Sequence, residues 1–234
     1  RHPTQVTFLS DIVEDLSRRD FTINAMAYNP HLRKPLIDPF GGLMDLSQKL
    51  IRTVGQPEHR FAEDPLRIMR GIRFCAQLGF RLEENTFKAA LAHHHLLSKV
   101  SPERIRDELN KIMIAPDPLE SLMLLHEAGI FDVIFPQELN QYLSHAGQLA
   151  FKAVKLCTAD SMLRLAALYC CVVAHEDGIW DWTANNRVPE LSDKLKLVER
   201  SLRRLRYDNK TIRRVAQLVS HFPLQFGSDK AEVA

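Results

Sequence analysis

The stretch Glu63–Arg73 carries two adjacent acids, Glu63 and Asp64, and then three arginines at intervals of three residues. If the stretch is helical, Asp64, Arg67 and Arg70 lie on one side of the helix. A carboxylate accepts from an exocyclic amine, and a guanidinium donates to a ring nitrogen or a carbonyl oxygen. This pair would fit cytosine and adenine and reject guanine and uracil, because a buried charged group left unpaired costs roughly 2–4 kcal/mol. The alternative is a surface ion pair, and for the stretch taken alone that alternative is favoured.

A second charged group lies nearer the start of the chain, at Arg18-Arg19-Asp20. Two arginines beside an aspartate could bind phosphates and a ribose hydroxyl, and Asn24 follows Asp20 by one helical turn. A solvated helix end with an Asp–Arg pair is the alternative, and the charge pattern by itself favours it.

A tight connection is expected at Asp38-Pro39-Phe40-Gly41-Gly42. Proline and paired glycines allow backbone angles that other residues avoid. The segment could be a hinge between a mixed domain and a helical one, or only a turn, which its composition favours.

The last third of the chain is rich in cations opposite an apolar seam. Such a stripe suits an RNA backbone, although a solvated helix face is an equal alternative. The cations are Lys194, Lys196, Arg200, Arg203, Arg204, Arg206, Lys210, Arg213 and Arg214.

Histidines and cysteines predict neither a metal site nor a disulfide framework. His93-His94-His95 and His175-Glu176-Asp177 have no convergent partners at ligand spacing. The four cysteines show no C-x-x-C spacing, which predicts free thiols in a reducing cytosol.

The composition is that of an ordinary soluble globular protein. The chain has 234 residues, 45% of them hydrophobic and 26% charged, with a net charge of +2 that says little about partners. No apolar run has the length needed to span a membrane.

Patterning predicts a mainly α fold with a small α/β part at the N-terminus. Within residues 1–57 we expect short strands at Gln5–Leu9, Leu36–Asp38 and Ile51–Val54, and helices at Phe21–Tyr28 and Leu43–Leu50. Beyond that part almost everything is expected to be helical. The predicted helices cover residues 58–79, 83–97, 101–115, 118–129, 148–158 and 161–174, and two further helices, 191–205 and 212–219, are separated by a break at Tyr207-Asp208-Asn209.

Taken together, in this order and spacing, the motifs resemble the class II nucleotidyltransferase family, which includes tRNA nucleotidyltransferases (CCA-adding enzymes) and bacterial poly(A) polymerases. The resemblance covers residues 1 to about 130. The matching motifs are Arg18-Arg19-Asp20-Phe21-Thr22-Ile23-Asn24-Ala25-Met26, Asp38-Pro39-Phe40-Gly41-Gly42, Glu63-Asp64-Pro65-Leu66-Arg67-Ile68-Met69-Arg70 and Ser101-Pro102-Glu103-Arg104-Ile105.

The resemblance implies a nucleotide site in which Arg19 contacts the triphosphate and Asp20 reads the ribose 2′-hydroxyl. Asp64 and Arg67 would form a protein template for C or A. The full set expected to bind the nucleotide is Arg19, Asp20, Asn24, Asp64, Arg67, Arg70 and Arg73.

The resemblance also implies supporting and RNA-binding groups. The hinge or support residues would be Asp38, Gly41, Gly42, Glu63, Glu103 and Arg104. The residues expected to hold the acceptor end of a tRNA are Arg203, Arg204, Arg206, Arg213 and Arg214.

One family feature is not found in this sequence. The family's catalytic element is a glycine-rich turn followed by two aspartates at D-x-D spacing, which hold two Mg²⁺ for in-line phosphoryl transfer. Here Asp11 and Asp15 are four apart, and no glycine-rich loop precedes them. We therefore expect no catalytic residue in this chain, Mg²⁺ carboxylates upstream of it, and no nucleotide addition by this chain alone.

The expected function is CCA addition to tRNA from CTP and ATP in the cytoplasm, without a membrane partner. Poly(A) addition is the alternative within the family, and a non-catalytic helical RNA-binding module is the alternative of another class. The expected parts are the palm remnant at 1–57, a helical neck at 58–130 and a helical body and tail at 131–234. The sequence leaves open whether two copies of the chain form a homodimer through the tail.

Overall fold

The computed structural model describes residues 12–173 and 188–221. The strand expected at Gln5–Leu9 and the cluster His175-Glu176-Asp177 lie outside these residues. The elements are α1 (Ile12–Ser17), η1 (Thr22–Asn24), β1 (Ala27–Tyr28), β2 (Leu36–Ile37), α2 (Gly42–Ser47), β3 (Leu50–Ile51), α3 (Pro57–Glu63), α4 (Leu66–Leu78), β4 (Arg81–Leu82), α5 (Glu84–His93), η2 (His94–Lys99), α6 (Pro102–Met113), α7 (Leu119–Glu127), α8 (Ile130–Ile134), α9 (Gln137–Leu156), α10 (Ser161–Val173), α11 (Val188–Arg204) and α12 (Asn209–Ser220).

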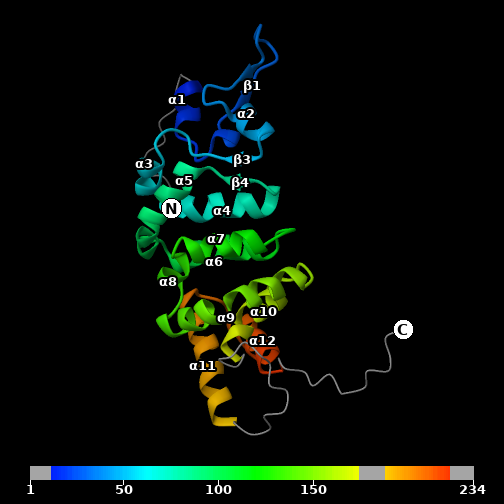
Figure 1. Ribbon diagram of the computed structural model, residues 1–234. Coiled ribbons are helices and arrows are strands. Elements are labelled where there is room, and N and C mark those ends of the chain that lie inside the picture. The colour runs from blue at the N-terminus through cyan, green and yellow to red at the C-terminus, as the bar shows by residue number, and fades with distance from the viewer. Residues whose placement is uncertain (1–11, 174–187, 222–234) are drawn as a thin grey trace, which may run out of the picture.

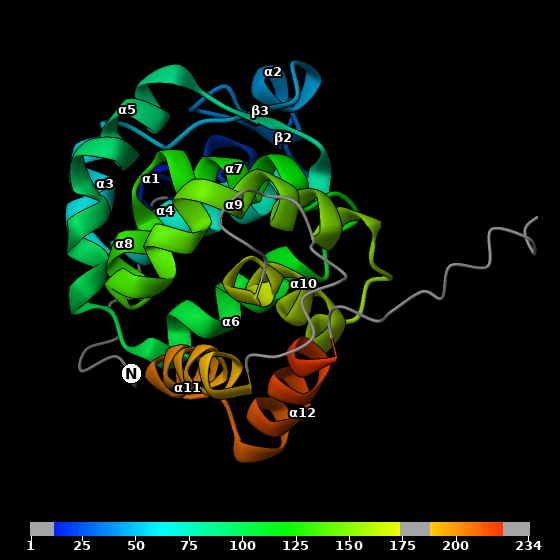
Figure 2. The same cartoon turned by 60° about the horizontal axis from the view of Figure 1, so that its bottom comes forward.

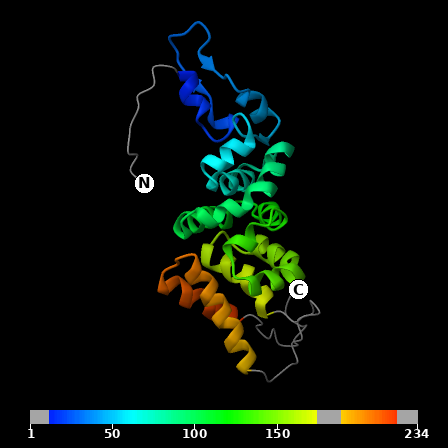
Figure 3. The ribbon, with the colours of Figure 1, turned by 90° about the vertical axis from the view of Figure 1, so that its left-hand side faces the viewer.

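The elements follow one another along the long axis of the molecule. The short elements α1 to β3 lie at one end, α4 to α7 cross the middle, and α11 and α12 lie at the other end (Figures 1 and 3). Within the described residues, the strands form only two two-stranded sheets. The prediction of a mainly α fold with a small N-terminal α/β part is confirmed.

The two sheets tie the N-terminal part together and then to the helices. β1 pairs with β2 in antiparallel register, with Ala27 opposite Ile37. β3 pairs with β4 in parallel register, with Leu50 opposite Arg81. The second pairing attaches the mixed N-terminal part to the segment between α4 and α5.

A single apolar core runs through the helical part, from Phe61 in α3 to Val219 in α12. Near α8 it contains a group of packed rings, with centroids of Phe131 and Phe135 5.3 Å apart and those of Phe135 and Tyr169 6.1 Å apart. α10 lies against α9 and α12 (Figure 2). Burial of these rings is the main stabilising contribution in this region.

Arg164 of α10 is a buried charge that holds the end of α6. Its guanidinium donates to the carbonyls of Met113 (2.6 Å) and Ala115 (2.7 Å). Carbonyls in the last turn of a helix have no partner within that helix, so Arg164 supplies one. It donates to the Cys157 carbonyl as well, at 3.2 Å.

The helix predicted at Phe21–Tyr28 is wrong except for the single turn η1. The Thr22 amide donates to the Arg52 carbonyl (2.9 Å), and the Val54 amide donates to the Asp20 carbonyl (3.1 Å). These backbone bonds draw the segment into an extended pairing beside β3. The pairing is limited to a bridge between Phe21 and Thr53. Phe21 and Ala25 are buried, whereas Tyr28 is exposed, so the apolar composition of the segment does not reflect a buried helix.

The single helix predicted over residues 58–79 is broken at Asp64-Pro65, between α3 and α4. Asp64 has an extended backbone (φ −143°, ψ 99°) because the ring of a following proline disfavours the helical region. Its carboxylate accepts from the Leu66 amide at 3.2 Å and so caps the start of α4.

Two further properties of the described residues bear on the sequence predictions. None of the helices combines the length and apolar character that crossing a bilayer requires. All four cysteines are free thiols. Burial raises the pKa of Cys75 and of Cys170 to about 12 in each case, so both stay protonated and unreactive at neutral pH.

Candidate functional site

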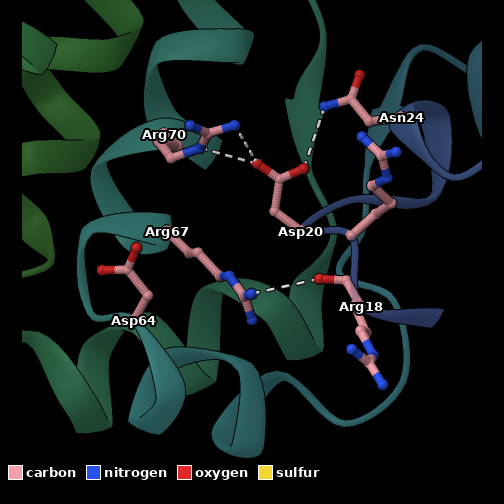
Figure 4. Close-up of a pocket in the computed structure, with 7 residues that line it drawn as sticks. Arg18, Asp20, Asn24, Asp64, Arg67 and Arg70 are labelled. Atoms are coloured by element: carbon pink, nitrogen blue, oxygen red, sulfur yellow. Dashed lines mark hydrogen bonds and ion pairs between the residues drawn. The ribbon is translucent and has the colours of Figure 1, made fainter. Parts of the chain in front are cut away.

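A polar cavity of about 530 Å³ opens between the end of α1, η1 and the junction of α3 with α4 (Figure 4). Its walls carry more cations than carboxylates, which suits a polyanionic ligand. The lining residues are Arg18, Arg19, Asp20, Asn24, Asp64, Arg67 and Arg70. The structure thus brings six of the seven predicted nucleotide-binding residues together.

The packing of Phe21 fixes the position of the adjacent charged segment Arg18-Arg19-Asp20. Its ring is fully buried and lies edge-on to Phe74 at 5.7 Å. The ring also lies beside Gly71 of α4, where an added Cβ would come within 3.0 Å of it. Because Phe21 is adjacent to Asp20, this packing sets the Asp20 carboxylate next to the second turn of α4.

Asp20 is the central acceptor of the cavity. One of its oxygens accepts from the Phe21 amide (2.9 Å) and the Asn24 side chain (3.2 Å). The other accepts from Nε of Arg70 at 2.8 Å and lies 2.6 Å from its Nη2. Figure 4 shows Arg70 and Asn24 on opposite sides of the carboxylate. A carboxylate has about four acceptor positions, so Asp20 is saturated without a ligand.

Asp64 and Arg67 keep free capacity for a ligand. Asp64 accepts from Arg104 of α6 at 2.8 Å and from the Leu66 amide, which leaves acceptor positions open. Arg67 donates to Glu63 at 2.7 Å and to the Arg18 carbonyl at 3.3 Å. Both therefore remain able to contact a base edge.

Arg18 and Arg19 lie at the mouth of the cavity, and each forms an ion pair with an exposed carboxylate. Arg18 pairs with Glu14 at 2.7 Å and Arg19 with Asp15 at 2.9 Å. Both are exposed i,i+4 pairs between α1 and the two residues that follow it, and each contributes only a few tenths of a kcal/mol. A phosphate could replace these partners at little cost. Arg18 was not in the predicted nucleotide-binding set, although its place beside Arg19 was a usable signal.

Arg73 does not join the other predicted residues. It lies between α4 and α6, with Nε 3.2 Å from a carboxylate oxygen of Glu108, and both side chains are largely buried. Its guanidinium also lies over the Phe74 ring, 4.3 Å from the centroid. Its position fits a link between two helices, because α4 turns this residue away from the cavity.

Arg60 is a supporting residue that the sequence predictions missed. It donates to the Ser17 carbonyl at 2.6 Å and the Val54 carbonyl at 2.9 Å, and pairs with Glu63. Arg60 thus holds α3 against the segment that carries Arg18. Its spacing of three from Glu63 was the only signal in the sequence.

Glu63 is held between two guanidiniums. Burial raises the pKa of its carboxyl, but hydrogen bonds from Arg67 and Arg60 outweigh that effect, and the pKa is lowered overall. Of the other predicted support residues, Arg104 contacts Asp64, whereas the Glu103 side chain has no ion pair within the described part of the chain.

The segment Asp38–Gly42 forms a closely packed turn. The Asp38 carboxylate accepts from the amides of Gly42 (2.7 Å) and Leu43 (2.9 Å). Gly41 has a left-handed backbone (φ +74°), and a Cβ on Gly42 would lie 2.2 Å from the Thr22 carbonyl. Its role as a hinge stays a prediction.

The predicted RNA-binding residues lie on α11, α12 and the turn between them. Arg204 donates to the Val133 carbonyl at 2.8 Å, and Arg203 to the Asn209 side chain at 3.1 Å. Arg214 donates to Gln217 at 3.2 Å. The side chains of Arg206 and Arg213 have no hydrogen bond or ion pair within residues 12–173 and 188–221.

Around the cavity, the residues that the structure describes do not offer a site for Mg²⁺. Of the two carboxylates in the cavity, Asp20 is saturated and Asp64 faces Arg104. Among the residues that the structure describes, no group of three histidine, cysteine or acidic side chains could hold a metal ion. His93 and His94 instead contact the backbone carbonyls of Ala89 and Leu91.

Two protein families match this chain. The family described as "Poly A polymerase head domain" matches residues 1–52. The family described as "Probable RNA and SrmB- binding site of polymerase A" matches residues 79–141.

Curated relatives match the first part of the chain. The CCA-adding enzyme of Lactobacillus johnsonii is 48% identical over 134 residues, covering 57% of this chain and 33% of the relative. That of Geobacillus thermodenitrificans is 48% identical over 130 residues, covering 56% and 32%. The chain therefore spans about a third of the length of the curated relatives it matches.

Solved structures match nearly the whole chain. The Bacillus stearothermophilus CCA-adding enzyme in complex with CTP has a TM-score of 0.68 at 28% identity, covering 93% of this chain and 48% of that one. The Thermotoga maritima CCA-adding enzyme complexed with tRNA has a TM-score of 0.56 at 25% identity, covering 90% and 57%. With the cavity and its charged motifs, these similarities show that the chain belongs to the nucleotidyltransferase family of CCA-adding enzymes and poly(A) polymerases.

Proposed function

We propose that this chain is the nucleotide-selecting and RNA-holding part of a CCA-adding tRNA nucleotidyltransferase. The whole enzyme would transfer CMP and AMP from CTP and ATP to the 3′ end of tRNA. The observation that carries this proposal is the meeting of Asp64 and Arg67 with Arg19 and Asp20 around one cavity. Such a cavity offers contacts for a base, a ribose and a phosphate chain.

Base selection would come from the unused hydrogen-bonding capacity of Asp64 and Arg67. The Asp64 carboxylate would accept from the exocyclic amine of cytosine or adenine, and Arg67 would donate to the neighbouring ring nitrogen. Guanine and uracil carry an N–H and a carbonyl there, which leaves both protein groups mismatched.

The phosphates would lie at the mouth, on Arg18 and Arg19. These guanidiniums would exchange their exposed partners Glu14 and Asp15 for a more highly charged ligand. Asp20 would accept from the ribose 2′-hydroxyl once Arg70 shares or leaves its oxygen. Mg²⁺ would be held by carboxylates supplied from outside this chain, so the chain alone would not add nucleotides.

The rest of the proposal concerns organisation and setting. Residues 1–57 would belong to the palm, 58–130 to a neck and 131–234 to an RNA-binding body and tail, acting in the cytoplasm. Pairing of two copies through the tail stays a prediction without a contact to support it.

The test measures nucleotide binding by the purified chain through its thermal unfolding. The melting temperature is recorded with each of the four ribonucleoside triphosphates. CTP and ATP should raise the melting temperature, and GTP and UTP should not. Asp64→Asn keeps an oxygen that can cap α4 but loses the charge, and it should abolish the preference. Glu58→Gln is the control, because Glu58 is an acid of α3 that does not line the cavity.

Poly(A) addition is the second candidate, supported by the description of the family that matches residues 1–52. Binding of ATP without CTP would favour it over CCA addition. Binding of tRNA without any nucleotide would instead favour a helical RNA-binding module and overturn the enzyme proposal.

A further inference from the structure

Arg60 lies outside the nucleotide cavity, next to residues that line it. Its side chain comes from the middle of α3, is only 18% exposed and is not part of the cavity wall. Nε donates to the Val54 carbonyl at 2.9 Å, and Nη2 donates to the Ser17 carbonyl at 2.6 Å. Nη1 donates to the two carboxylate oxygens of Glu63, at 3.2 and 2.9 Å. Every nitrogen of this guanidinium is therefore in use.

The three partners of Arg60 come from different parts of the chain. Ser17 ends α1 immediately before Arg18, Val54 follows β3, and Glu63 ends α3. A guanidinium is planar and presents its N–H groups in a fixed fork, so the groups bound to it are held at fixed positions relative to one another. Arg60 thus sets the end of α3 against the segment that enters the cavity.

Glu63 links Arg60 to Arg67. Its Oε2 accepts from Nη1 of Arg60 at 2.9 Å and from Nη1 of Arg67 at 2.7 Å. The Glu63 side chain is 53% exposed, and an unrestrained glutamate at such a position samples several rotamers. The carboxylate that orients Arg67 is therefore itself oriented by Arg60.

The other hydrogen bonds of the Arg67 side chain within the described residues also depend on Arg60. Nη1 of Arg67 donates to the Arg60 carbonyl at 3.3 Å, and Nη2 donates to the Arg18 carbonyl at 3.3 Å. Figure 4 shows Arg67 extended toward Arg18. Arg18 directly follows Ser17, whose carbonyl Arg60 holds. The direction of the Arg67 guanidinium is thus set by groups that Arg60 supplies or fixes.

Arg52 shows what a brace of the fold without a link to the cavity looks like. Its Nε donates to Asp45 of α2 at 3.1 Å, and its Nη1 lies 3.8 Å from Glu83 at the start of α5. Like Arg60, it ties the N-terminal part to the helices. Neither of its acidic partners lines the nucleotide cavity or bonds to Arg67. The two arginines therefore differ in one respect, which is the contact of Glu63 with Arg67.

We propose that Arg60 is a positioning residue for base selection, which fixes the direction of the Arg67 guanidinium through Glu63. The proposal rests on the proposed function, because it takes Arg67 as one of the two groups that read the base. It goes beyond that function by making the choice of base depend on a residue that the nucleotide does not touch. An Arg67 that is free to turn could donate to a uracil carbonyl as well as to the ring nitrogen of cytosine, which weakens the discrimination.

The test measures the dissociation constants of CTP and UTP by isothermal titration for wild type, Arg60→Met and Arg52→Met. Methionine keeps much of the aliphatic length of arginine without its donors. Arg60→Met should reduce the preference for CTP over UTP about tenfold, the effect of losing one well-oriented hydrogen bond to a charged group. Arg52→Met should leave the preference unchanged even where it lowers the melting temperature, since its partners do not contact Arg67.

A double-mutant cycle tests whether Arg60 acts through Arg67. In an Arg67→Met background, which lacks the reading guanidinium, Arg60→Met should change the ratio of the two dissociation constants no further. Glu63→Gln keeps an acceptor but loses the charge, and it should reproduce part of the loss seen in Arg60→Met. Because Ser17 and Val54 stay bound to Arg60 in Glu63→Gln, this variant carries the test if Arg60→Met does not fold.

An unchanged preference for CTP in both Arg60→Met and Glu63→Gln would overturn the proposal and leave Arg60 as a structural brace. An equal loss in Arg52→Met would also overturn it, because the effect would then be a general loosening of the chain. A further loss in the Arg67→Met background would show that Arg60 does not act through Arg67. Equal binding of CTP and UTP by the wild type would instead contradict the nucleotide site itself, so the two failures are distinguishable.

Discussion

Arg70 of α4 binds Asp20 with two nitrogens on the same carboxylate oxygen, at 2.8 and 2.6 Å. The pair joins the segment after α1 to the second turn of α4, across the cavity. Because the second Asp20 oxygen is also occupied, a ribose hydroxyl can reach this carboxylate only when a bond to Arg70 is shared or released. In the proposed function, Arg70 would thus hold the carboxylate that reads the ribose until a nucleotide binds.

Asp20→Ala should remove discrimination between ribonucleotides and deoxyribonucleotides. A hydrogen bond to a charged group contributes about 1.5–3 kcal/mol, so CTP affinity should fall roughly tenfold or more. The affinity for dCTP should change much less, which brings the ratio of the two dissociation constants close to one. Isothermal titration with both nucleotides checks this.

The control for that experiment is Asp15→Ala, which removes the exposed partner of Arg19. It should leave the preference for CTP over dCTP in place. A preference that survives Asp20→Ala would show that another group reads the ribose.

Gly42→Ala should destabilise the chain much more than Gly41→Ala. At Gly42 the new methyl group would meet the Thr22 carbonyl at 2.2 Å, so the backbone must move, at a cost of about 2 kcal/mol or more. At Gly41 nothing lies within 4 Å, and only the left-handed backbone is unfavourable, at about 1 kcal/mol. Urea unfolding of both variants measures the difference. Equal losses would mean that α2 is not packed as closely on η1 as described.

Glu83→Gln should lower stability at neutral pH but not in acid. Glu83 caps α5 by accepting from the Thr86 amide (2.8 Å) and hydroxyl (2.9 Å). Burial raises the pKa of the carboxyl, but these bonds, with the Asn85 amide and Arg52, lower it overall. A lowered pKa means that the stabilisation is present above the unfolded value of about 4.3 and is lost as the pH falls through the folded value.

The measurement is the difference in melting temperature between wild type and Glu83→Gln, from pH 7 down to pH 3. A cap of this kind contributes about 1 kcal/mol. The difference should shrink below about pH 4. A difference in melting temperature that is the same at every pH would show that the charge of Glu83 does not contribute to stability.

Arg164→Met should lower the free energy of unfolding more than most substitutions in the helical part. The arginine is buried and donates to the carbonyls of Met113 and Ala115 at the end of α6 and to that of Cys157 at the end of α9. Methionine fills similar space but leaves those carbonyls unpaired, at about 1–3 kcal/mol for each buried group. The free energy of unfolding should fall by roughly 3 kcal/mol or more. Lys155→Met, which removes an exposed pair with Asp117, should cost less than about 1 kcal/mol.

Most helices could be predicted from the sequence because their signals are local. The proline at the start of α6, Gly79 after α4 and the apolar spacing along α12 all act within a few residues. The break at Asp64 was missed because helical periodicity continues across it, and only the effect of Pro65 on its neighbour indicates the end of α3. β4 was missed because it is defined by its pairing with β3, where Leu50 lies opposite Arg81, far away in the chain.

The cavity could be predicted because each of its walls is a short motif. Arg19 and Asp20 come from one motif and Asp64, Arg67 and Arg70 from another, and the resemblance joined the two. Arg73 lies apart from the other predicted residues because its direction depends on Glu108, which lies on a different helix. Its position in a regular series of arginines gave no sign of that partner.

The apolar core crosses residue 130 without interruption, and this limits how the chain can be divided. Ile130, Phe131 and Phe135 are buried, and the ring of Phe131 lies 5.9 Å from that of Phe151 on α9. A fragment ending near residue 130 would expose the surface against which these rings pack, and the complementary fragment would expose the rings themselves. Both pieces would carry large apolar patches, and such patches promote aggregation. The helical part is therefore best produced and studied as one piece, although its two ends serve different ligands in the proposed function.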